Sequence, residues 1–353
     1  MEVIYDPAHR GHAVATEIAW GASVPAYESP ERAEIIRQAL LDDGGFVCSS
    51  PTDHGRDRIT AVHDPGLVRF LERAWRDFQQ VEARSEVFPD TVLHGGLRTG
   101  MGPAPEPESV EAALGYWSFE TMTPVTEGSF DAAVSSVNVA LSAWERVRNG
   151  DRAAYGLCRP PGHHATTALY GGYCFFNNAA IVAQAHLDTG GGRVTVLDVD
   201  YHHGNGTQQI FYARDDVQFV SLHADPHRAY PYFCGHADET GTGRGLGSTL
   251  NTALGAGIDD DRYLEALAPA LEAIDRFDPD LLVVSLGVDT FDGDPIGDFK
   301  ISTDGMGRVG HAVGQLSRPS VILQEGGYHL GALGVNVAGW LVGFERSAGL
   351  RPA

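Results

Sequence analysis

The second half of the chain alternates between short apolar runs and longer amphipathic stretches. The apolar runs are rich in β-branched residues and occupy residues 194–199, 217–222, 281–286 and 320–324. Runs of this length and composition are typical of strands that are buried on both faces. Helical patterns lie between them, at residues 176–187 and 260–274. This alternation predicts an α/β fold with a parallel sheet and helices on both faces, in a single domain spanning residues 1–353.

Polar clusters follow directly on the predicted strands. They lie at residues 159–164, 198–203, 223–225, 289–294 and 325–328. In open parallel sheets, ligands bind outside the carboxyl ends of the strands. We therefore expect these clusters to converge on one site, although they are far apart in the sequence.

Residues 80–128 lack a regular pattern because prolines and glycines interrupt it. The prolines are Pro89, Pro103, Pro105, Pro107 and Pro124. An irregular stretch of this length inside a compact domain is usually a lid, a binding loop or an interface. The alternative is an ordinary surface loop.

The charge balance excludes one class of function. Asp and Glu outnumber Lys and Arg by 47 to 25, which gives the 353 residues a net charge of −22. A protein that binds nucleic acid needs a basic face to neutralise phosphates, so we expect no nucleic-acid partner. The acidic balance suits a cationic substrate, although solubility alone also explains it.

The remaining composition predicts a cytoplasmic protein. The first residues lack the basic and apolar regions of a signal peptide, and no apolar run has the length of a membrane span, so we expect no membrane partner. The cysteines have no CxxC spacing, which predicts free thiols. They are Cys48, Cys158, Cys174 and Cys234.

Asp200 and His202 form the strongest chemical signal. They follow a predicted strand, and residues two apart on an extended chain point to the same side. A carboxylate and an imidazole suit Zn²⁺, and a catalytic zinc has three protein ligands and one open position. Asp289, after the strand at 281–286, supplies the third ligand. A lone Asp or His at a strand end more often caps a loop, but several such ends together favour a metal site.

Two further clusters supply acid–base groups. His163 and His164 lie on a loop with two prolines, and a neutral imidazole beside a metal can act as a general base. A carboxylate such as Asp198 would keep one histidine charged and oriented. Tyr328 follows two glycines that permit a tight turn, and its phenol can donate a hydrogen bond to a developing oxyanion.

Five motifs together resemble the zinc-dependent histone deacetylase family. They are PGHHA at 161–165, DVDYHHGNGTQ at 198–208, SLH at 221–223, LGVDTFDGDP at 286–295 and EGGY at 325–328. Their spacing is similar, within that family, to the bacterial acetylpolyamine amidohydrolases. The resemblance implies an arginase-like, three-layer α/β fold with an eight-stranded, mostly parallel sheet. It also implies hydrolysis of an N-acetyl amide to acetate and a free amine.

The resemblance implies catalytic roles for five residues. It assigns general base and acid work to His164 and electrostatic support to His163. Asp198 falls behind His163, and Asn205 falls behind His164, where some relatives have Asp. Tyr328 falls on the position that polarises the substrate carbonyl.

The resemblance also implies two cations. Zinc falls to Asp200, His202 and Asp289. A structural potassium ion falls to a set that partly uses backbone carbonyls: Asp198, Asp200, His202, Ser221 and Leu222.

Substrate contacts follow from the same resemblance. Tyr173 and Tyr230 match an aromatic pair that grips the methylene chain, although ordinary core packing would also explain them. Glu17 and Glu111 fall near acidic positions that receive the distal ammonium of a polyamine. A third such position aligns with Met122, and Glu120 lies two residues earlier, so this acid is either shifted or absent.

The resemblance gives residues 80–128 a role as well. They fall where the polyamine enzymes carry an insertion that dimerises and narrows the mouth of the active site. A homodimer is therefore implied, with a channel that excludes bulky protein substrates.

Alternatives remain at this stage. The arginase and agmatinase group shares the fold, but its two-manganese site needs carboxylates where this chain has Gly204 and Gly287. A non-catalytic binding protein is a second alternative, although the site positions retain competent side chains. The same reaction on acetyl-lysine or another small amide is a third. Iron also competes with zinc for an Asp-His-Asp site through its availability.

Overall fold

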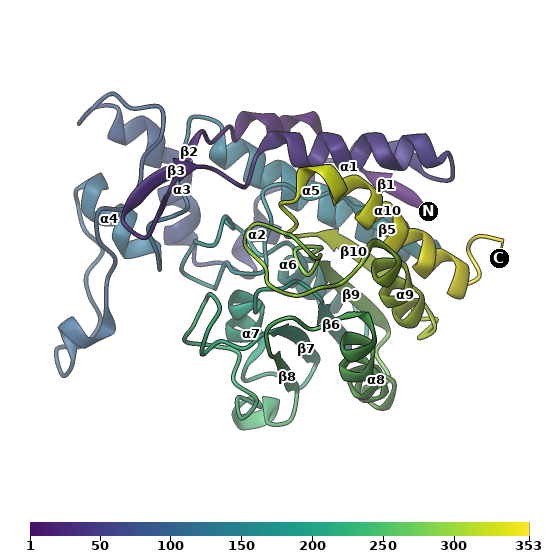
Figure 1. Cartoon of the computed structure of the whole chain (residues 1–353). Coiled ribbons are helices and arrows are strands. Elements are labelled where there is room, and N and C mark those ends of the chain that lie inside the picture. Colours follow the sequence, from purple (N-terminus) through teal and green to yellow (C-terminus); the bar gives the residue numbers. More distant parts are fainter. Residues whose placement is uncertain (353) are drawn as a thin grey trace.

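A computed structural model describes residues 1–352, and its centre is an eight-stranded sheet between two layers of helices (Figure 1). Every neighbouring pair of strands in this sheet is parallel. In spatial order the strands are β4 (Val47–Ser49), β1 (Glu2–Ile4), β5 (Ala153–Gly156), β10 (Ser320–Gln324), β9 (Leu281–Leu286), β6 (Val194–Asp198), β7 (Val217–Ala224) and β8 (Thr249–Leu254). A separate hairpin consists of β2 (Thr16–Ala19) and β3 (Ala22–Pro25). The predicted α/β class is confirmed, with a sheet that is parallel throughout.

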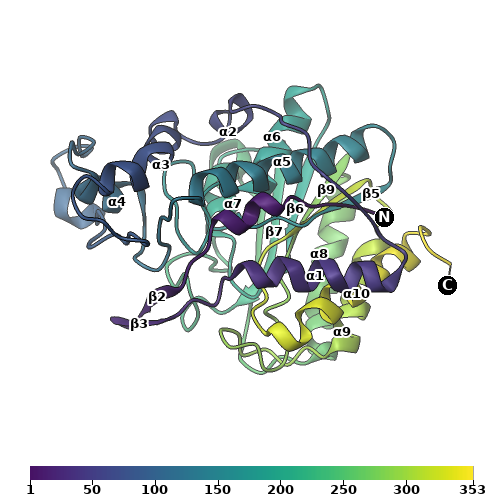
Figure 2. The ribbon, with the colours of Figure 1, turned by 90° about the horizontal axis from the view of Figure 1, so that it is seen from above.

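The helices cover both faces of the sheet. They are α1 (Pro30–Asp43), α2 (Asp57–Thr60), α3 (Pro65–Phe78), α4 (Val110–Trp117), α5 (Ser129–Arg148), α6 (Asn178–Asp188), α7 (Asn205–Phe211), α8 (Asp260–Phe277), α9 (Thr303–Gly314) and α10 (Leu330–Ser347). Figure 2 shows α5 and α6 on one side of the sheet and α1, α9 and α10 on the other. Successive residues of β9 bury opposite faces, so Leu281 and Val283 join the core beneath α5 and α6. Leu282 and Val284 join the core beneath α8, α9 and α10.

Local signals set the ends of the two predicted helices. The side chain of Asn177 accepts a hydrogen bond from the Ala180 amide (2.9 Å), so α6 begins at Asn178. Helix α8 continues beyond the predicted Ile274 to Phe277, where Asp278 adopts a left-handed conformation and ends it.

Residues 88–124 form an arm that projects from the body of the molecule (Figure 1). The arm is closed at its base, where Val87 and Val125 exchange two backbone hydrogen bonds (3.0 and 2.9 Å). The predicted irregularity does not extend through the whole arm, because Ser109 caps the helix α4 by accepting a hydrogen bond from the Ala112 amide. Pro and Gly content alone did not predict this helix.

All four cysteines are free thiols, as predicted. Within residues 1–352, no helix combines the length and the apolar character that crossing a bilayer requires.

Candidate active site

The carboxyl ends of β6 and β9 bring Asp200, His202 and Asp289 together. These two strands are neighbours, with Asp198 opposite Ser285, so the chain leaves the sheet at the same edge in both. His202 Nδ1 lies 3.0 Å from Asp289 Oδ2 and 3.4 Å from Asp200 Oδ1. One ligand atom from each of the three residues lies within 4.8 Å of the others, and all three residues are buried.

The charge of this cluster fits a bound cation. Both carboxylates are fully buried, and among residues 1–352 no Arg or Lys forms an ion pair with either of them. Burial and the neighbouring Asp200 raise the pKa of Asp289 to about 7. Burial would also raise the pKa of Asp200, but His163 and His202 lower it. A metal ion would neutralise this repulsion and take the three donors as ligands.

Glycines leave no room for additional carboxylates beside these ligands. A Cβ atom on Gly287 would lie 2.0 Å from Asp200 Oδ2, and one on Gly204 would lie 2.2 Å from Asp198 Oδ2. These are the two positions at which a two-manganese site would need extra carboxylates. The packing therefore favours one metal ion.

The adjacent histidines have opposite pKa shifts. Their ring centroids are 4.0 Å apart. Burial would lower the pKa of His163, but Asp200 and Asp198 raise it to about 10, and Asp198 Oδ2 lies 3.0 Å from His163 Nδ1. Burial, and then the charges of His163 and His202, lower the pKa of His164 well below its usual value. His163 is thus suited to remain charged and His164 to remain neutral near pH 7.

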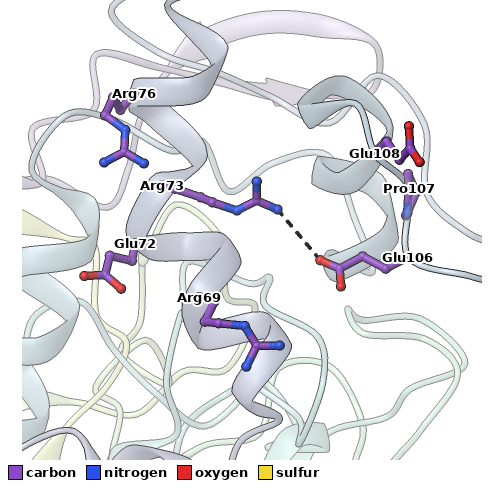
Figure 3. A pocket seen from close by; sticks show the side chains of 7 residues that line it. All are labelled: Arg69, Glu72, Arg73, Arg76, Glu106, Pro107 and Glu108. Carbon is purple, nitrogen blue, oxygen red and sulfur yellow. Dashed lines mark ion pairs between the residues drawn. The ribbon is translucent and has the colours of Figure 1, made fainter.

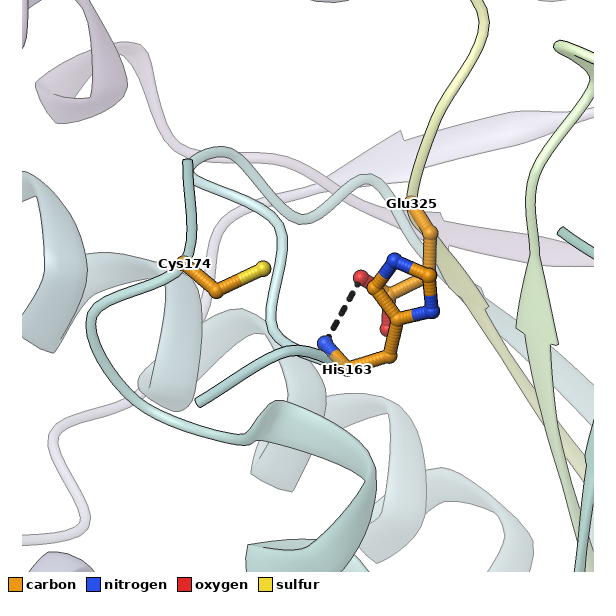
Figure 4. A group of neighbouring side chains, drawn as sticks. All are labelled: His163, Cys174 and Glu325. Carbon is orange, nitrogen blue, oxygen red and sulfur yellow. Dashed lines mark hydrogen bonds between the residues drawn. The ribbon is translucent and has the colours of Figure 1, made fainter. Parts of the chain in front are cut away.

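Glu325 holds the loop that carries these histidines, a role that the sequence analysis missed. Its Oε2 accepts hydrogen bonds from the amides of Gly162 (2.6 Å) and His163 (3.2 Å), and Ser285 Oγ donates to its Oε1 (3.1 Å). Figure 4 shows Glu325 and Cys174 beside His163. These three residues also meet the geometry of a metal cluster. His163 Nδ1 already has a hydrogen-bond partner in Asp198, and Glu325 already accepts from the loop amides. We therefore interpret the group as a support for the loop.

The turn that carries Tyr328 is held from two sides. Asp294 Oδ2 accepts hydrogen bonds from the amides of Tyr328 (2.8 Å) and His329 (3.0 Å). Arg32 donates to the carbonyls of Glu325 and Gly327, at 2.7 Å each, and its guanidinium lies 4.5 Å from the centroid of the Tyr328 ring. Burial raises the pKa of Tyr328 well above 10, so its hydroxyl stays protonated as a donor.

The sequence offered unequal signals for these supports. Asp294 and Glu325 lie inside the motifs that follow β9 and β10, so the sequence marks both residues. Arg32 lies on α1 and is anchored by Glu28, whose Oε1 accepts from Arg32 Nη1 at 3.0 Å. No local pattern marks either residue.

The two predicted gripping residues lie beside the metal cluster. The Tyr173 ring is 5.8 Å from the Tyr328 ring, and the Tyr230 ring is 5.1 Å from His164, centroid to centroid. Ser221, a predicted potassium ligand, lies opposite Asp198 on the neighbouring strand β7, and Leu222 follows it.

The two predicted ammonium receptors have different surroundings. Glu17 is buried, and its carboxylate accepts hydrogen bonds from the Tyr173 hydroxyl (3.1 Å) and the Tyr27 amide (3.3 Å). Glu111 lies exposed in the first turn of α4, and its side chain makes no hydrogen bond or ion pair with any other described residue.

A separate surface cavity of about 720 Å³ lies between α3 and the arm (Figure 3). Arginines of α3 face Glu106 and Glu108 across it, and Arg73 lies 3.9 Å from Glu106. The charges are mixed and none of the predicted site residues lines it. We therefore place the active site at the metal cluster and not in this cavity.

Comparison with known proteins identifies the family. The model of the histone deacetylase domain matches residues 26–342. The chain belongs to the histone deacetylase family. Enzymes of this family are generally metal-dependent, and the cluster of Asp200, His202 and Asp289 is the candidate site for the metal.

Curated relatives match over almost the whole chain. Acetylpolyamine amidohydrolase 2 of Pseudomonas aeruginosa is 45% identical over 98% of this chain and 99% of its own length. Acetylpolyamine amidohydrolase of Mycoplana ramosa is 41% identical over 97% and 99%. The crystal structure of acetylpolyamine aminohydrolase from Burkholderia pseudomallei superposes with a TM-score of 0.92 at 39% identity, covering 98% of this chain and 99% of that one. These matches confirm the resemblance drawn from the five motifs.

Proposed function

We propose that this deacetylase-family enzyme hydrolyses the acetyl amide of an acetylpolyamine to acetate and the free amine. The observation that carries the proposal is the buried Asp200–His202–Asp289 cluster beside two histidines whose pKa values are shifted in opposite directions. Relatives named acetylpolyamine amidohydrolases, 40–45% identical over nearly the whole chain, support the choice of substrate.

Zinc is the metal that best suits Asp200, His202 and Asp289, and potassium suits the second predicted set of ligands. A bound Zn²⁺ ion lowers the pKa of a water molecule and polarises the acyl carbonyl. A potassium ion would be held by Asp198, Asp200, His202, Ser221 and Leu222. Iron remains a competitor for the Asp-His-Asp ligands in the cell.

The residues of the chain divide the work of hydrolysis. His164, neutral and oriented by Asn205, takes a proton from the attacking water and returns it to the departing amine nitrogen as the C–N bond breaks. His163, kept charged by Asp198, stabilises the negative charge that develops nearby. The Tyr328 hydroxyl donates a hydrogen bond to the oxyanion of the acetyl carbonyl. Tyr173 and Tyr230 enclose the methylene chain of the substrate.

A comparison of three substrates tests the function. We expect acetate release from N-acetylputrescine and acetylspermidine to exceed that from an acetyl-lysine peptide, because the net charge of −22 and the exposed Glu111 favour a small cation. The measurement is kcat/KM for each amide with zinc-loaded protein. A peptide that is much the best substrate would overturn the polyamine assignment and leave the mechanism standing, whereas no acetate from any of the three would overturn the deacetylase function.

Metal stoichiometry tests the single site. Wild-type protein should bind one zinc ion per chain, and Gly287→Ala should weaken zinc binding about 10–100-fold, because its Cβ must displace Asp200. Competition with a chelator measures the affinity. Gly255→Ala is the matched control, since a Cβ there meets no atom within 4 Å. Two bound equivalents together with urea-releasing activity would contradict the proposal and favour a ureohydrolase.

The arm supports a homodimer. It exposes three large apolar side chains, Leu93, Leu97 and Met101, and Leu97 is 74% exposed. Exposed apolar side chains gathered on one projecting segment are typical of an interface. We propose that the arm contacts a second copy of the chain close to the mouth of the active site. We also propose, from the composition of the sequence, that the enzyme acts in the cytoplasm.

A further inference from the structure

The end of the arm runs along the loop that carries Tyr173. We call residues 117–123 the bracing segment and residues 170–174 the gripping loop. The Tyr170 amide donates to the Trp117 carbonyl (2.9 Å), and the Phe119 amide donates to the Tyr170 carbonyl (3.3 Å). A parallel bridge between Ser118 and Tyr170 results. The two segments are therefore joined by backbone hydrogen bonds.

The gripping loop has an unusual backbone that needs external support. Gly171, Gly172 and Tyr173 have φ values of 155°, 59° and 64°. A tyrosine in the left-handed region is uncommon and persists only where its surroundings enforce it. The loop is also tightly enclosed, because a Cβ on Gly172 would lie 2.4 Å from the His164 ring and one on Gly171 would lie 2.7 Å from Phe119.

Glu120 and Thr123 supply this support. Glu120 Oε1 accepts hydrogen bonds from the Gly172 amide (3.1 Å) and from Thr123 Oγ1 (2.5 Å), while Oε2 accepts from the Met122 amide. Thr123 Oγ1 accepts a hydrogen bond from the Tyr173 amide (2.8 Å). Both oxygens of Glu120 are thus engaged inside the protein.

The bracing segment also contacts Tyr230, the second proposed gripping residue. The ring of Phe119 stacks on Tyr230, with centroids 6.4 Å apart and an interplanar angle of 26°. The bracing segment therefore contacts both proposed gripping residues, Tyr173 and Tyr230.

We propose that Glu120 and Thr123 of the bracing segment are positioning residues for Tyr173, which hold this side chain where it meets the methylene chain of the substrate. The inference rests on the proposed function, because Tyr173 and Tyr230 are taken as the channel walls. Glu120 therefore does not serve as the third receptor for the distal ammonium, since its carboxylate is already occupied by internal donors. The bracing segment therefore affects how the methylene chain of the substrate fits, and the charge of the distal ammonium is recognised by other residues.

Two matched substrates separate shape from charge. N-acetylputrescine carries a distal ammonium, and N-pentylacetamide has a methyl group in its place. Glu120→Ala should lower kcat/KM about tenfold on both amides, through loss of one or two hydrogen bonds, and leave their ratio unchanged. A loss confined to N-acetylputrescine would show that Glu120 binds the ammonium and would overturn the inference, as would unaltered kcat/KM on both. Glu108→Ala is the control, because it removes an exposed acid from the same arm.

A second pair of variants and a second measurement guard against misfolding. Thr123→Val removes the acceptor for the Tyr173 amide, whereas Thr123→Ser keeps it, so only the valine variant should reproduce the tenfold loss. Amide hydrogen exchange of residues 170–174 should accelerate in Thr123→Val and not in Thr123→Ser. Unchanged hydrogen exchange in the valine variant would contradict the positioning role of Thr123, whether or not the protein hydrolyses either amide. Hydrolysis of neither amide by the wild-type protein would refute the proposed function, which is a separate outcome.

Discussion

Replacing Tyr328 with Phe is expected to lower kcat by about 10²–10³-fold, the usual effect of removing one oxyanion donor. The substitution deletes only the hydroxyl. Asp294 and Arg32 hold the turn through its backbone, and the guanidinium of Arg32 can pack against a phenyl ring as it does against the phenol. Because burial keeps the pKa of Tyr328 well above 10, the lost group is a neutral donor and not a phenolate.

The measurement is single-substrate kinetics on N-acetylputrescine together with the zinc content of the purified variant. We expect KM to change little and zinc to remain at one equivalent, since Tyr328 is not among the three proposed ligands. Tyr212→Phe serves as the matched control, because the Tyr212 hydroxyl makes no hydrogen bond with any residue from 1 to 352. Near-normal turnover of Tyr328→Phe would remove this residue from the mechanism.

The position of the site could be predicted from the sequence because parallel strands end at one edge. The apolar runs before Asp198 and Asp289 marked β6 and β9, and the side chains that follow these strands meet in space. Sequence alone did not supply the pairing of the two strands. The structure supplied it, because β6 and β9 are neighbouring parallel strands with Asp198 opposite Ser285.

The residues that position the catalytic groups were largely invisible to sequence reasoning. Arg32 binds mostly to backbone carbonyls, and backbone partners leave no trace in the amino-acid pattern. Glu325 stands inside the EGGY motif, but the motif does not reveal that its carboxylate binds backbone amides. Glu17 illustrates the same problem from the other direction. Its sequence position suggested an ammonium receptor, and the fold buries its carboxylate against the Tyr173 hydroxyl. Its role as a receptor therefore stays a prediction.

The arm shows how far composition can be used. Its prolines and glycines predicted an irregular segment, and long irregular segments tend to lie at functional sites. Composition did not reveal α4, nor the contacts of Glu120 with the gripping loop, because the cap of α4 and these contacts are made by particular side chains. The proposed brace is consequently a property of the fold that no motif records.

The second large effect is expected from His164→Ala, which should lower kcat by about 10²–10⁴-fold, the usual contribution of a positioned general base. Asn205 Oδ1 accepts from His164 Nδ1 at 2.7 Å, and Asn205 Nδ2 donates to the His164 carbonyl at 3.3 Å. The proton therefore sits on Nδ1, and the lone pair of Nε2 is free to accept one. Zinc content should not change, and His311→Ala, which alters an exposed histidine of α9, is the control.

The role of His164 predicts the direction in which activity changes with pH. His164 acts in its neutral form, so kcat/KM at saturating zinc should fall as the pH drops through its lowered pKa, below 6.5. The charge of His163 is one cause of that lowering. In His163→Gln the charge is gone, so the pKa of His164 should rise and the acidic limb of the profile should move to higher pH. An acidic limb that stays in place in His163→Gln would mean that another group, and not His164, accepts the proton.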